Sequence, residues 1–135
     1  MTEKRFKKWT MPIIQERTLH PKYHFLVHHV DNLELGENTD IGAFTYINAQ
    51  YGVAIEKDVQ IGSHCSIYSL STIDKKQGQV TIKENARVGT HSTVMPGVTI
   101  GKNAIVGAYS FVNKNVPNDT IAYGVPVKIK RKSKT

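Results

Sequence analysis

The chain has 135 residues, 39% of them hydrophobic, and this length suits a single domain with one core. Its one cysteine, Cys65, excludes an intramolecular disulfide and a cysteine-based metal cluster. The formal net charge is +7, and half of the 18 basic residues lie in two clusters, at 4–8 and 128–134. Such clusters attract phosphorylated ligands, membranes or nucleic acid. No nucleic-acid-binding motif accompanies them, so we expect no nucleic-acid partner.

Residues 1–30 lack the repeat described below, and we expect an N-terminal extension that caps the repeats or packs on a neighbour. Their basic start lacks the apolar stretch of a secretory signal, so a cytoplasmic location is expected. No apolar run approaches the roughly 18–20 residues of a membrane span. The stretch TEKRFKKW at 2–9 suits a short helix that ends before Met11–Pro12. A histidine-rich stretch, LHPKYHFLVHH, follows at 19–29.

Between residues 31 and 127, aliphatic residues recur every six positions, and glycine often follows them. Two positions before them the residue is mostly small or β-branched, and Cys65 occupies one of these packing positions. A helix would space apolar residues by three and four, and an exposed strand would alternate. Period six instead fits very short strands joined by tight turns, each sending one large side chain into a narrow shaft. The pattern therefore predicts a parallel β-helix.

Three strands per coil divide the aliphatic residues into three stacks. The first stack holds Leu35, Ile55, Ile82 and Ile100; the second holds Ile41, Ile61, Val88 and Val106; the third holds Ile47, Ile67, Val94 and Val112. The step from Ile67 to Ile82 is 15 residues (82 − 67), where six would continue the coil. We therefore expect a loop at about 68–79 that projects from a corner. Residues 128–135 are expected to form a basic C-terminal tail.

The stretch from 33 to 131 resembles the hexapeptide-repeat acyltransferases. Its final part, VNKNVPNDTIAYGVPVKIKR at 112–131, resembles the galactoside, maltose and sugar-nucleotide acetyltransferase branch. The resemblance implies an all-β fold, a left-handed parallel β-helix of hexapeptide repeats with a projecting loop and a short non-repeat N-terminal segment. It also implies a homotrimer with active sites between subunits, and acetyl-CoA (coenzyme A) as the acyl donor.

The resemblance places contacts to the acyl donor on six residues: Thr90, Ala108, Asn113, Lys114, Lys128 and Arg131. A small residue such as Ala108 permits close approach to the backbone, and the cations of Lys128 and Arg131 suit phosphates. The alternative is that Ala108 merely fits a tight corner and that the cations are solvated.

On the acceptor side, YINAQ at 46–50 matches the family segment that supplies an asparagine to a sugar, here Asn48. A turn asparagine is the alternative. Many relatives carry a histidine in the projecting loop that removes a proton from the attacking hydroxyl. Here Thr72 stands at that position, and threonine cannot act as a base near neutral pH. Asp74 can titrate but lies two residues away.

Three explanations stay open for the missing base. His64 and His91 hold equivalent positions one coil apart, should lie about 5 Å from each other, and are candidate catalytic residues. A histidine from 19–29 can reach the cleft instead. Alternatively, the acceptor is an amine, which attacks a thioester without first losing a proton, so that the enzyme mainly orients it. Four loop residues would then bind the acceptor: Ser69, Ser71, Thr72 and Asp74.

The leading interpretation is acetyl transfer from acetyl-CoA to a sugar or sugar nucleotide, with N-acylation of an amino sugar ahead of O-acylation because of Thr72. Cell-surface polysaccharide synthesis is the setting that the resemblance implies. One alternative is a non-catalytic β-helix that serves as a scaffold. Another is a metalloenzyme like the γ-class carbonic anhydrases, which need three histidines on zinc. The repeat supplies only His64 and His91, so no metal is expected.

Overall fold

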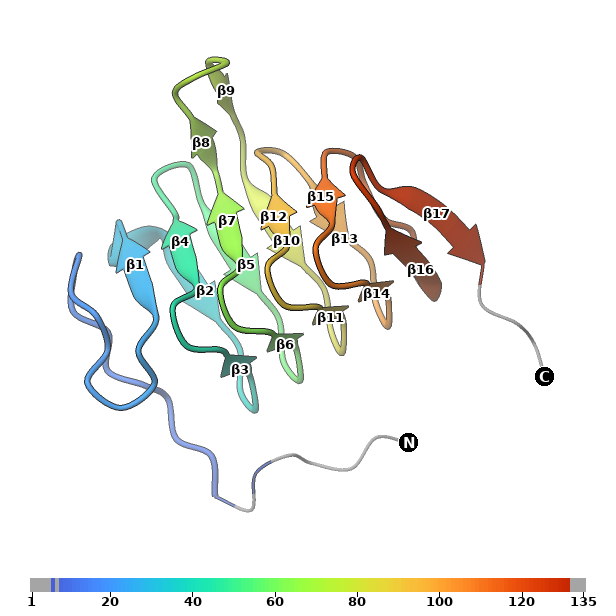
Figure 1. The fold of residues 1–135 in the computed structure, drawn as a ribbon. Coiled ribbons are helices and arrows are strands. Elements are labelled where there is room, and N and C mark those ends of the chain that lie inside the picture. The colour runs from blue at the N-terminus through green and yellow to red at the C-terminus, as the bar shows by residue number, and fades with distance from the viewer. Residues whose placement is uncertain (1–5, 7, 132–135) are drawn as a thin grey trace.

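The computed structural model describes residue 6 and residues 8–131. Over these residues the chain winds into a parallel β-helix of short stacked strands, with one projecting hairpin (Figure 1). The β-helix and the projecting loop that the repeat predicts are confirmed. The helix expected at 2–9 lies mostly outside the described residues, and Lys8 and Trp9 are not helical. No helix in the described part of the chain has the length and apolar character needed to cross a membrane.

Three sheets form the three faces of the coil. Face A holds β1 (Leu26–His28), β4 (Tyr46–Asn48), β7 (Ser66–Tyr68), β12 (Thr93–Val94) and β15 (Phe111–Val112). Face B holds β2 (Leu33–Leu35), β5 (Val53–Ile55), β10 (Val80–Ile82) and β13 (Thr99–Ile100). Face C holds β3 (Asp40–Ile41), β6 (Gln60–Ile61), β11 (Arg87–Val88), β14 (Ile105–Val106), β16 (Thr120–Tyr123) and β17 (Lys128–Arg131). A single 3₁₀ turn, η1 (Val30–Asn32), links β1 to β2, and β8 (Leu70–Ser71) pairs with β9 (Lys76–Gln77) in the projecting hairpin.

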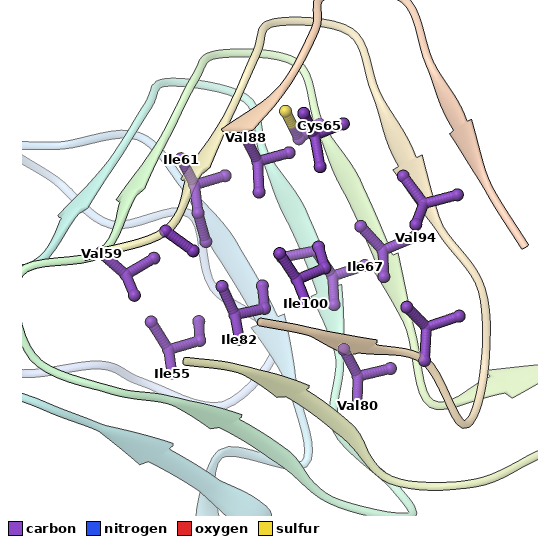
Figure 2. Packing of buried hydrophobic residues seen from close by; sticks show 14 of the residues in the cluster. Ile55, Val59, Ile61, Cys65, Ile67, Val80, Ile82, Val88, Val94 and Ile100 are labelled. Carbon is purple, nitrogen blue, oxygen red and sulfur yellow. The ribbon is translucent and has the colours of Figure 1, made fainter. Parts of the chain in front are cut away.

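The core is a shaft of aliphatic side chains stacked from coil to coil. On face B the parallel registers place Ile82 between Ile55 and Ile100, as Figure 2 shows. All three are at most 2% exposed. Faces A and C repeat this arrangement, so the three stacks predicted from the sequence are confirmed. Burial of each isoleucine contributes about 1.5–3 kcal/mol, which makes the repeat the main source of stability.

The coil extends beyond both boundaries expected from the repeat. β1 lies within the segment 1–30 and pairs in parallel with β4. At the other end, β17 takes up the first four residues of the expected basic tail. It returns antiparallel along β16, with Lys128 opposite Tyr123 and Arg131 opposite Thr120. An antiparallel return strand has no six-residue period, which is why the repeat does not reveal it. The rest of that tail, 132–135, lies outside the described residues.

The segment before β1 is fastened to the first coil by hydrogen bonds. Trp9 Nε1 donates to the carbonyl of Thr39 at 2.9 Å. The carboxylate of Glu16 accepts the backbone N–H groups of His29 and Val30, each at 2.7 Å. These two backbone donors hold the pKa of Glu16 below its usual value. The proposed cap rests on these contacts.

The corner between faces B and C carries asparagine or aspartate in the left-handed backbone conformation on every coil. Asn85 Nδ2 donates to Asn103 Oδ1 at 2.8 Å, and Asn103 Nδ2 donates to Asp119 Oδ1 at 3.0 Å. Asparagine and aspartate tolerate positive φ better than most other residues with a side chain. We call this set the asparagine corner; its members, with φ between 56° and 62°, are Asn38, Asp58, Asn85, Asn103 and Asp119.

Candidate functional site

The corner between faces C and A has the same backbone conformation but carries aromatic side chains. We call this set the aromatic corner; its members, with φ between 56° and 64°, are His24, Phe44, His64, His91 and Tyr109. Their rings form a continuous stack with successive centroid distances of 6.2, 5.3, 4.7 and 4.8 Å. The planes of His64 and His91 differ by 2°. The prediction that these two histidines lie about one strand spacing apart is confirmed.

Phe44 and Tyr109 are unusual residues for this backbone conformation. Positive φ costs a residue with a bulky side chain about 1–2 kcal/mol. Burial does not offset this cost, because Phe44 is 57% and Tyr109 is 66% exposed. Residues held in such conformations concentrate at functional sites. The aromatic corner is therefore a candidate binding surface rather than a requirement of the fold.

Hydrogen bonds fix the tautomer of His91. Thr90 Oγ1 donates to the carbonyl of Ser63 at 2.8 Å, and it lies 2.8 Å from His91 Nδ1. A hydroxyl has one hydrogen, so the second contact requires His91 Nδ1–H to donate to Thr90 Oγ1. The lone pair of His91 then lies on Nε2.

The same geometry argues against a metal site at this pair. The lone pair of an imidazole nitrogen lies in the ring plane, and the planes of His64 and His91 are parallel and 4.7 Å apart between centroids. Their lone pairs therefore do not converge on one ion. Among residues 6 and 8–131 no group of three or more histidine, cysteine, aspartate or glutamate side chains is placed to hold a metal.

The expected donor residues divide between three places. Thr90 and Ala108 occupy the same position on consecutive coils, directly before His91 and Tyr109 of the aromatic corner. The coils approach closely there, because a Cβ at Gly89 would lie 2.6 Å from the backbone nitrogen of Ala108. Ala108 itself is exposed, so a ligand can reach the last of these corners.

The remaining donor candidates lie further from this corner. Asn113 and Lys114 are exposed at the other end of β15. Lys128 lies opposite Tyr123, close to the end of face C, whereas Arg131 lies three residues further along β17. That spacing corresponds to about 10 Å in an extended strand. The structure thus places Lys128 nearer than Arg131 to the aromatic corner.

On the acceptor side, Asn48 belongs to a hydrogen-bonded cluster on the outer surface of face A. Asn48 Nδ2 donates to Tyr46 Oη at 3.4 Å, and Tyr46 Oη lies 3.0 Å from His28 Nδ1. The ring of Tyr68 lies 5.8 Å from that of Tyr46 between centroids. Asn48 also acts as a turn asparagine, the alternative to sugar binding given above. Its Oδ1 accepts the N–H of Gln50 at 3.1 Å.

Sequence reasoning did not single out Tyr46 or His28. A signal for Tyr46 was present: it and Asn48 flank the inward-facing Ile47, so strand alternation places both on the outer surface. His28 lies outside the repeat, and only the pairing of β1 with β4 aligns it with Asn48. Of the histidines at 19–29, His28 is thus the one that reaches the predicted acceptor residue.

The four loop residues do not form one cluster. Ser69 is fully buried, and its hydroxyl donates to the carbonyl of Asn48 at 2.7 Å and accepts the N–H of Tyr51 at 3.0 Å. Ser71 donates a hydrogen bond to Asp74, which is the main reason that the pKa of Asp74 lies below its usual value. Lys76 lies 3.8 Å from the same carboxylate.

These contacts decide which loop groups can meet an acceptor. Ser69 is occupied in the turn and is not presented to a ligand. Asp74 remains a carboxylate at neutral pH and is a poor base. Thr72 is exposed near the tip of the hairpin. Because the hairpin and the histidines lie at opposite ends of β7, the loop of one chain does not reach its own His64.

Cys65 is a packing residue, as its position in the repeat indicates. It is 1% exposed, and its Sγ–H donates to the carbonyl of Gly89 at 3.2 Å. Burial raises the pKa of its thiol, so the nucleophilic thiolate is disfavoured.

Comparisons with known proteins agree with this geometry. The family model described as bacterial transferase hexapeptide (six repeats) matches residues 79–114. A galactoside O-acetyltransferase of Lactococcus lactis subsp. lactis (strain IL1403) is 34% identical over 112 residues, which are 72% of this chain and 54% of that protein. Residues 79–114 of the chain therefore carry the hexapeptide repeat of this transferase family. A galactoside O-acetyltransferase of Escherichia coli (strain K12) is 32% identical over 111 residues, covering 71% of this chain and 55% of that protein.

A solved structure shows the same fold with a donor bound. The hexapeptide-repeat-containing acetyltransferase from Vibrio cholerae O1 biovar eltor, complexed with acetyl coenzyme A, has a TM-score of 0.74 and 25% identity to this chain. The match covers 82% of this chain and 66% of that chain. The chain spans about half the length of the curated relatives it matches.

Proposed function

We propose that the protein transfers an acyl group, acetyl in the first place, from acyl-coenzyme A to a sugar or sugar nucleotide. The acceptor attacks the thioester directly, and main-chain N–H groups stabilise the developing oxyanion. The two galactoside O-acetyltransferase relatives support the reaction class. The bound acetyl coenzyme A of the Vibrio cholerae structure supports the donor. By family resemblance we place the reaction in cytoplasmic synthesis of polysaccharide precursors.

The observation that carries the proposal is the order of the candidate residues along the coil axis. Lys128 lies at the C-terminal end, Ala108 and Thr90 follow on successive coils, and Asn48 lies two coils further on, at the end of β4 that is opposite the aromatic corner. An extended donor with phosphates at one end and a thioester at the other fits this order. Its phosphates would meet Lys128 and Arg131, and its thioester would point toward β4.

The acceptor that we propose first is an amino sugar. Thr72 replaces the loop histidine of many relatives, and Asp74 is held as a carboxylate by Ser71, so the loop offers no base. A neutral amine needs orientation more than deprotonation. The second candidate is a hydroxyl, which the contact of His28 with Tyr46 favours, because that pair can take up a proton.

We propose a homotrimer with sites between subunits. The hairpin β8–β9 projects away from the coil (Figure 1), and Ile73 at its tip is 97% exposed. In a cyclic trimer each hairpin would pack on the next subunit and cover this apolar tip. Light scattering should give three times the chain mass, and Ile73→Asp should shift the protein toward smaller species. A monomeric wild-type protein would contradict this arrangement.

The test of the function is a donor-binding and transfer assay on the purified chain. Calorimetry with acetyl-CoA should show binding, and release of coenzyme A thiol should require an acceptor from a panel of amino-sugar nucleotides and galactosides. Amino-sugar nucleotides should give the highest kcat/KM. The proposal fails if acetyl-CoA neither binds nor loses its acetyl group with any acceptor. Tight binding of a macromolecule without donor binding would instead identify a scaffold.

A further inference from the structure

The contact between His28 and Tyr46 can run in either direction, depending on the tautomer of His28. Asn48 Nδ2 carries only hydrogens and therefore donates to Tyr46 Oη. Tyr46 Oη lies 3.0 Å from His28 Nδ1 and can donate its hydrogen there when the imidazole hydrogen is on Nε2. In that tautomer the three side chains form a chain of donors that runs from Asn48 through Tyr46 to His28.

This chain lies where a proton acceptor for the nucleophile is needed. All three side chains are half-buried on face A, and Tyr68, which directly precedes the projecting hairpin, packs beside Tyr46. The phenol oxygen of Tyr46 lies within hydrogen-bonding distance of the amide expected to hold the acceptor. An acceptor on Asn48 would thus place its attacking atom near Tyr46 Oη.

Other ionisable groups around β1 are engaged elsewhere. On the side opposite β4, Glu16 binds the backbone of His29 and Val30 and lies 3.5 Å from Arg17. Across β4, the ring of Tyr68 lies 5.8 Å from that of Tyr46 between centroids. Tyr46 is therefore the ionisable group that contacts the His28 ring directly.

We propose that Tyr46 and His28 form the proton relay of the acyl-transfer reaction, a role that rests on the proposed function. As the amine or hydroxyl of the acceptor bonds to the thioester carbon, its proton passes to Tyr46 Oη and the phenol proton passes to His28 Nδ1. The carbon–sulfur bond breaks, and coenzyme A leaves as a thiolate. The imidazolium returns its proton through solvent, and the thiolate is protonated. Tyr46 is the catalytic residue. His28 holds the phenol in position and accepts its proton.

The decisive variants are His28→Asn, Tyr46→Phe and the double substitution. Asparagine can still accept the phenol hydrogen bond near the position of Nδ1, but it does not titrate. Each single variant should lower kcat roughly 100-fold, with the acceptor KM changed less than about threefold. The double variant should be no slower than the singles, because both residues act in one relay. The matched control is His29→Asn, one residue along and with φ 66°, which asparagine tolerates.

The pH dependence separates a relay from a structural hydrogen bond. His28→Asn should change the pH profile of kcat, which the loss of a merely structural hydrogen bond would not do. Thermal melting and acetyl-CoA binding should stay as in the wild type, which excludes misfolding. Wild-type kcat and an unchanged pH profile in His28→Asn would overturn the proposal.

A measurement without turnover keeps the relay distinct from the proposed function. Long-range ¹H–¹⁵N spectra of the free protein should show neutral His28 as the Nε2–H tautomer. An Nδ1–H tautomer would overturn the relay even if the protein is an active transferase. If no acceptor is acetylated, the proposed function fails, and with it the relay as a catalytic device.

Discussion

Two corners of the coil share the same left-handed backbone conformation but carry different kinds of side chain. In the asparagine corner, the N–H of Asn103 donates to the carbonyl of Glu84 one coil back, at 3.1 Å. In the aromatic corner, the N–H of His91 donates to the carbonyl of Ser63 in the same way, also at 3.1 Å. The residue with positive φ is therefore held in the same way at both corners, by a backbone hydrogen bond to the coil before it.

The difference between the corners shows which one serves the fold. The asparagine corner uses residues that tolerate positive φ and adds hydrogen bonds between coils. The aromatic corner accepts the strain of residues such as Tyr109, with φ 59°, and leaves them exposed. Its side chains add contacts between rings, but Phe44 and Tyr109 stay more than half exposed. We infer that the asparagine corner contributes stability and that the aromatic corner contributes binding.

Ala108→Trp tests most directly whether the aromatic corner binds the donor. A large side chain at the last aromatic corner should exclude the donor and lower kcat/KM for acetyl-CoA by roughly 100-fold or more. The matched control is Lys102→Trp, at the equivalent exposed position directly before Asn103 of the asparagine corner, which should stay within about threefold of wild type. Steady-state kinetics and calorimetry measure both. Equal effects of the two substitutions would remove the donor from this corner.

Asn103→Ala tests the stability role of the asparagine corner. The substitution removes both side-chain hydrogen bonds and a residue suited to φ 60°, so the free energy of unfolding should fall by about 2–3 kcal/mol. Asn103→Gly loses the same bonds but tolerates the backbone, so it should cost about 1 kcal/mol less. Denaturant unfolding measures both, and kcat should stay near wild type. A large loss of kcat without loss of stability would reverse the assignment.

Tyr109→Asn replaces an exposed ring of the aromatic corner with the residue type found in the asparagine corner. Asparagine relieves the backbone strain, so the free energy of unfolding should stay within about 1 kcal/mol of wild type or rise. Loss of the exposed ring beside Ala108 should raise the KM for acetyl-CoA about tenfold, which corresponds to about 1.4 kcal/mol. Unchanged donor kinetics together with a clear loss of stability would show that the ring stack is structural.

The smallest expected effect concerns Glu16, which anchors the segment where the aromatic corner begins. The folded pKa of Glu16 lies below its usual value because the backbone N–H groups of His29 and Val30 bind its carboxylate. Its contribution to stability is therefore present above the unfolded pKa, about 4.3, and is lost as the pH falls through the folded pKa. Glu16→Gln should lower the melting temperature slightly at pH 7 and not at pH 2. An equal difference at both pH values would contradict this.

The sequence predicts the repeat much better than it predicts the site. The six-residue period identifies every stacked strand pair from Leu35 to Val112, because one inward side chain per strand repeats faithfully. The same period places His64 beside His91. The aromatic corner could also be predicted from the sequence, because Phe44 and Tyr109 each lie two positions after a repeat glycine, Gly42 or Gly107.

The arrangement of the acceptor side could not be predicted from the sequence in this way. His28 precedes the repeat. Its contact with Tyr46 depends on the pairing of β1 with β4, and no local sequence pattern predicts that pairing. Ser69 looked like a loop hydroxyl, yet the corner buries it. The basic residues of β17 have no period because they return antiparallel along β16. Long-range pairing therefore decides the details that sequence spacing does not contain.

The most direct test is a crystal structure of the protein with coenzyme A and an amino-sugar nucleotide. We predict that the pantetheine arm passes Ala108 and Thr90, that phosphates lie near Lys128, and that the acceptor nitrogen lies about 3 Å from Tyr46 Oη. Coenzyme A bound away from the aromatic corner, or an acceptor bound away from Asn48, would contradict it.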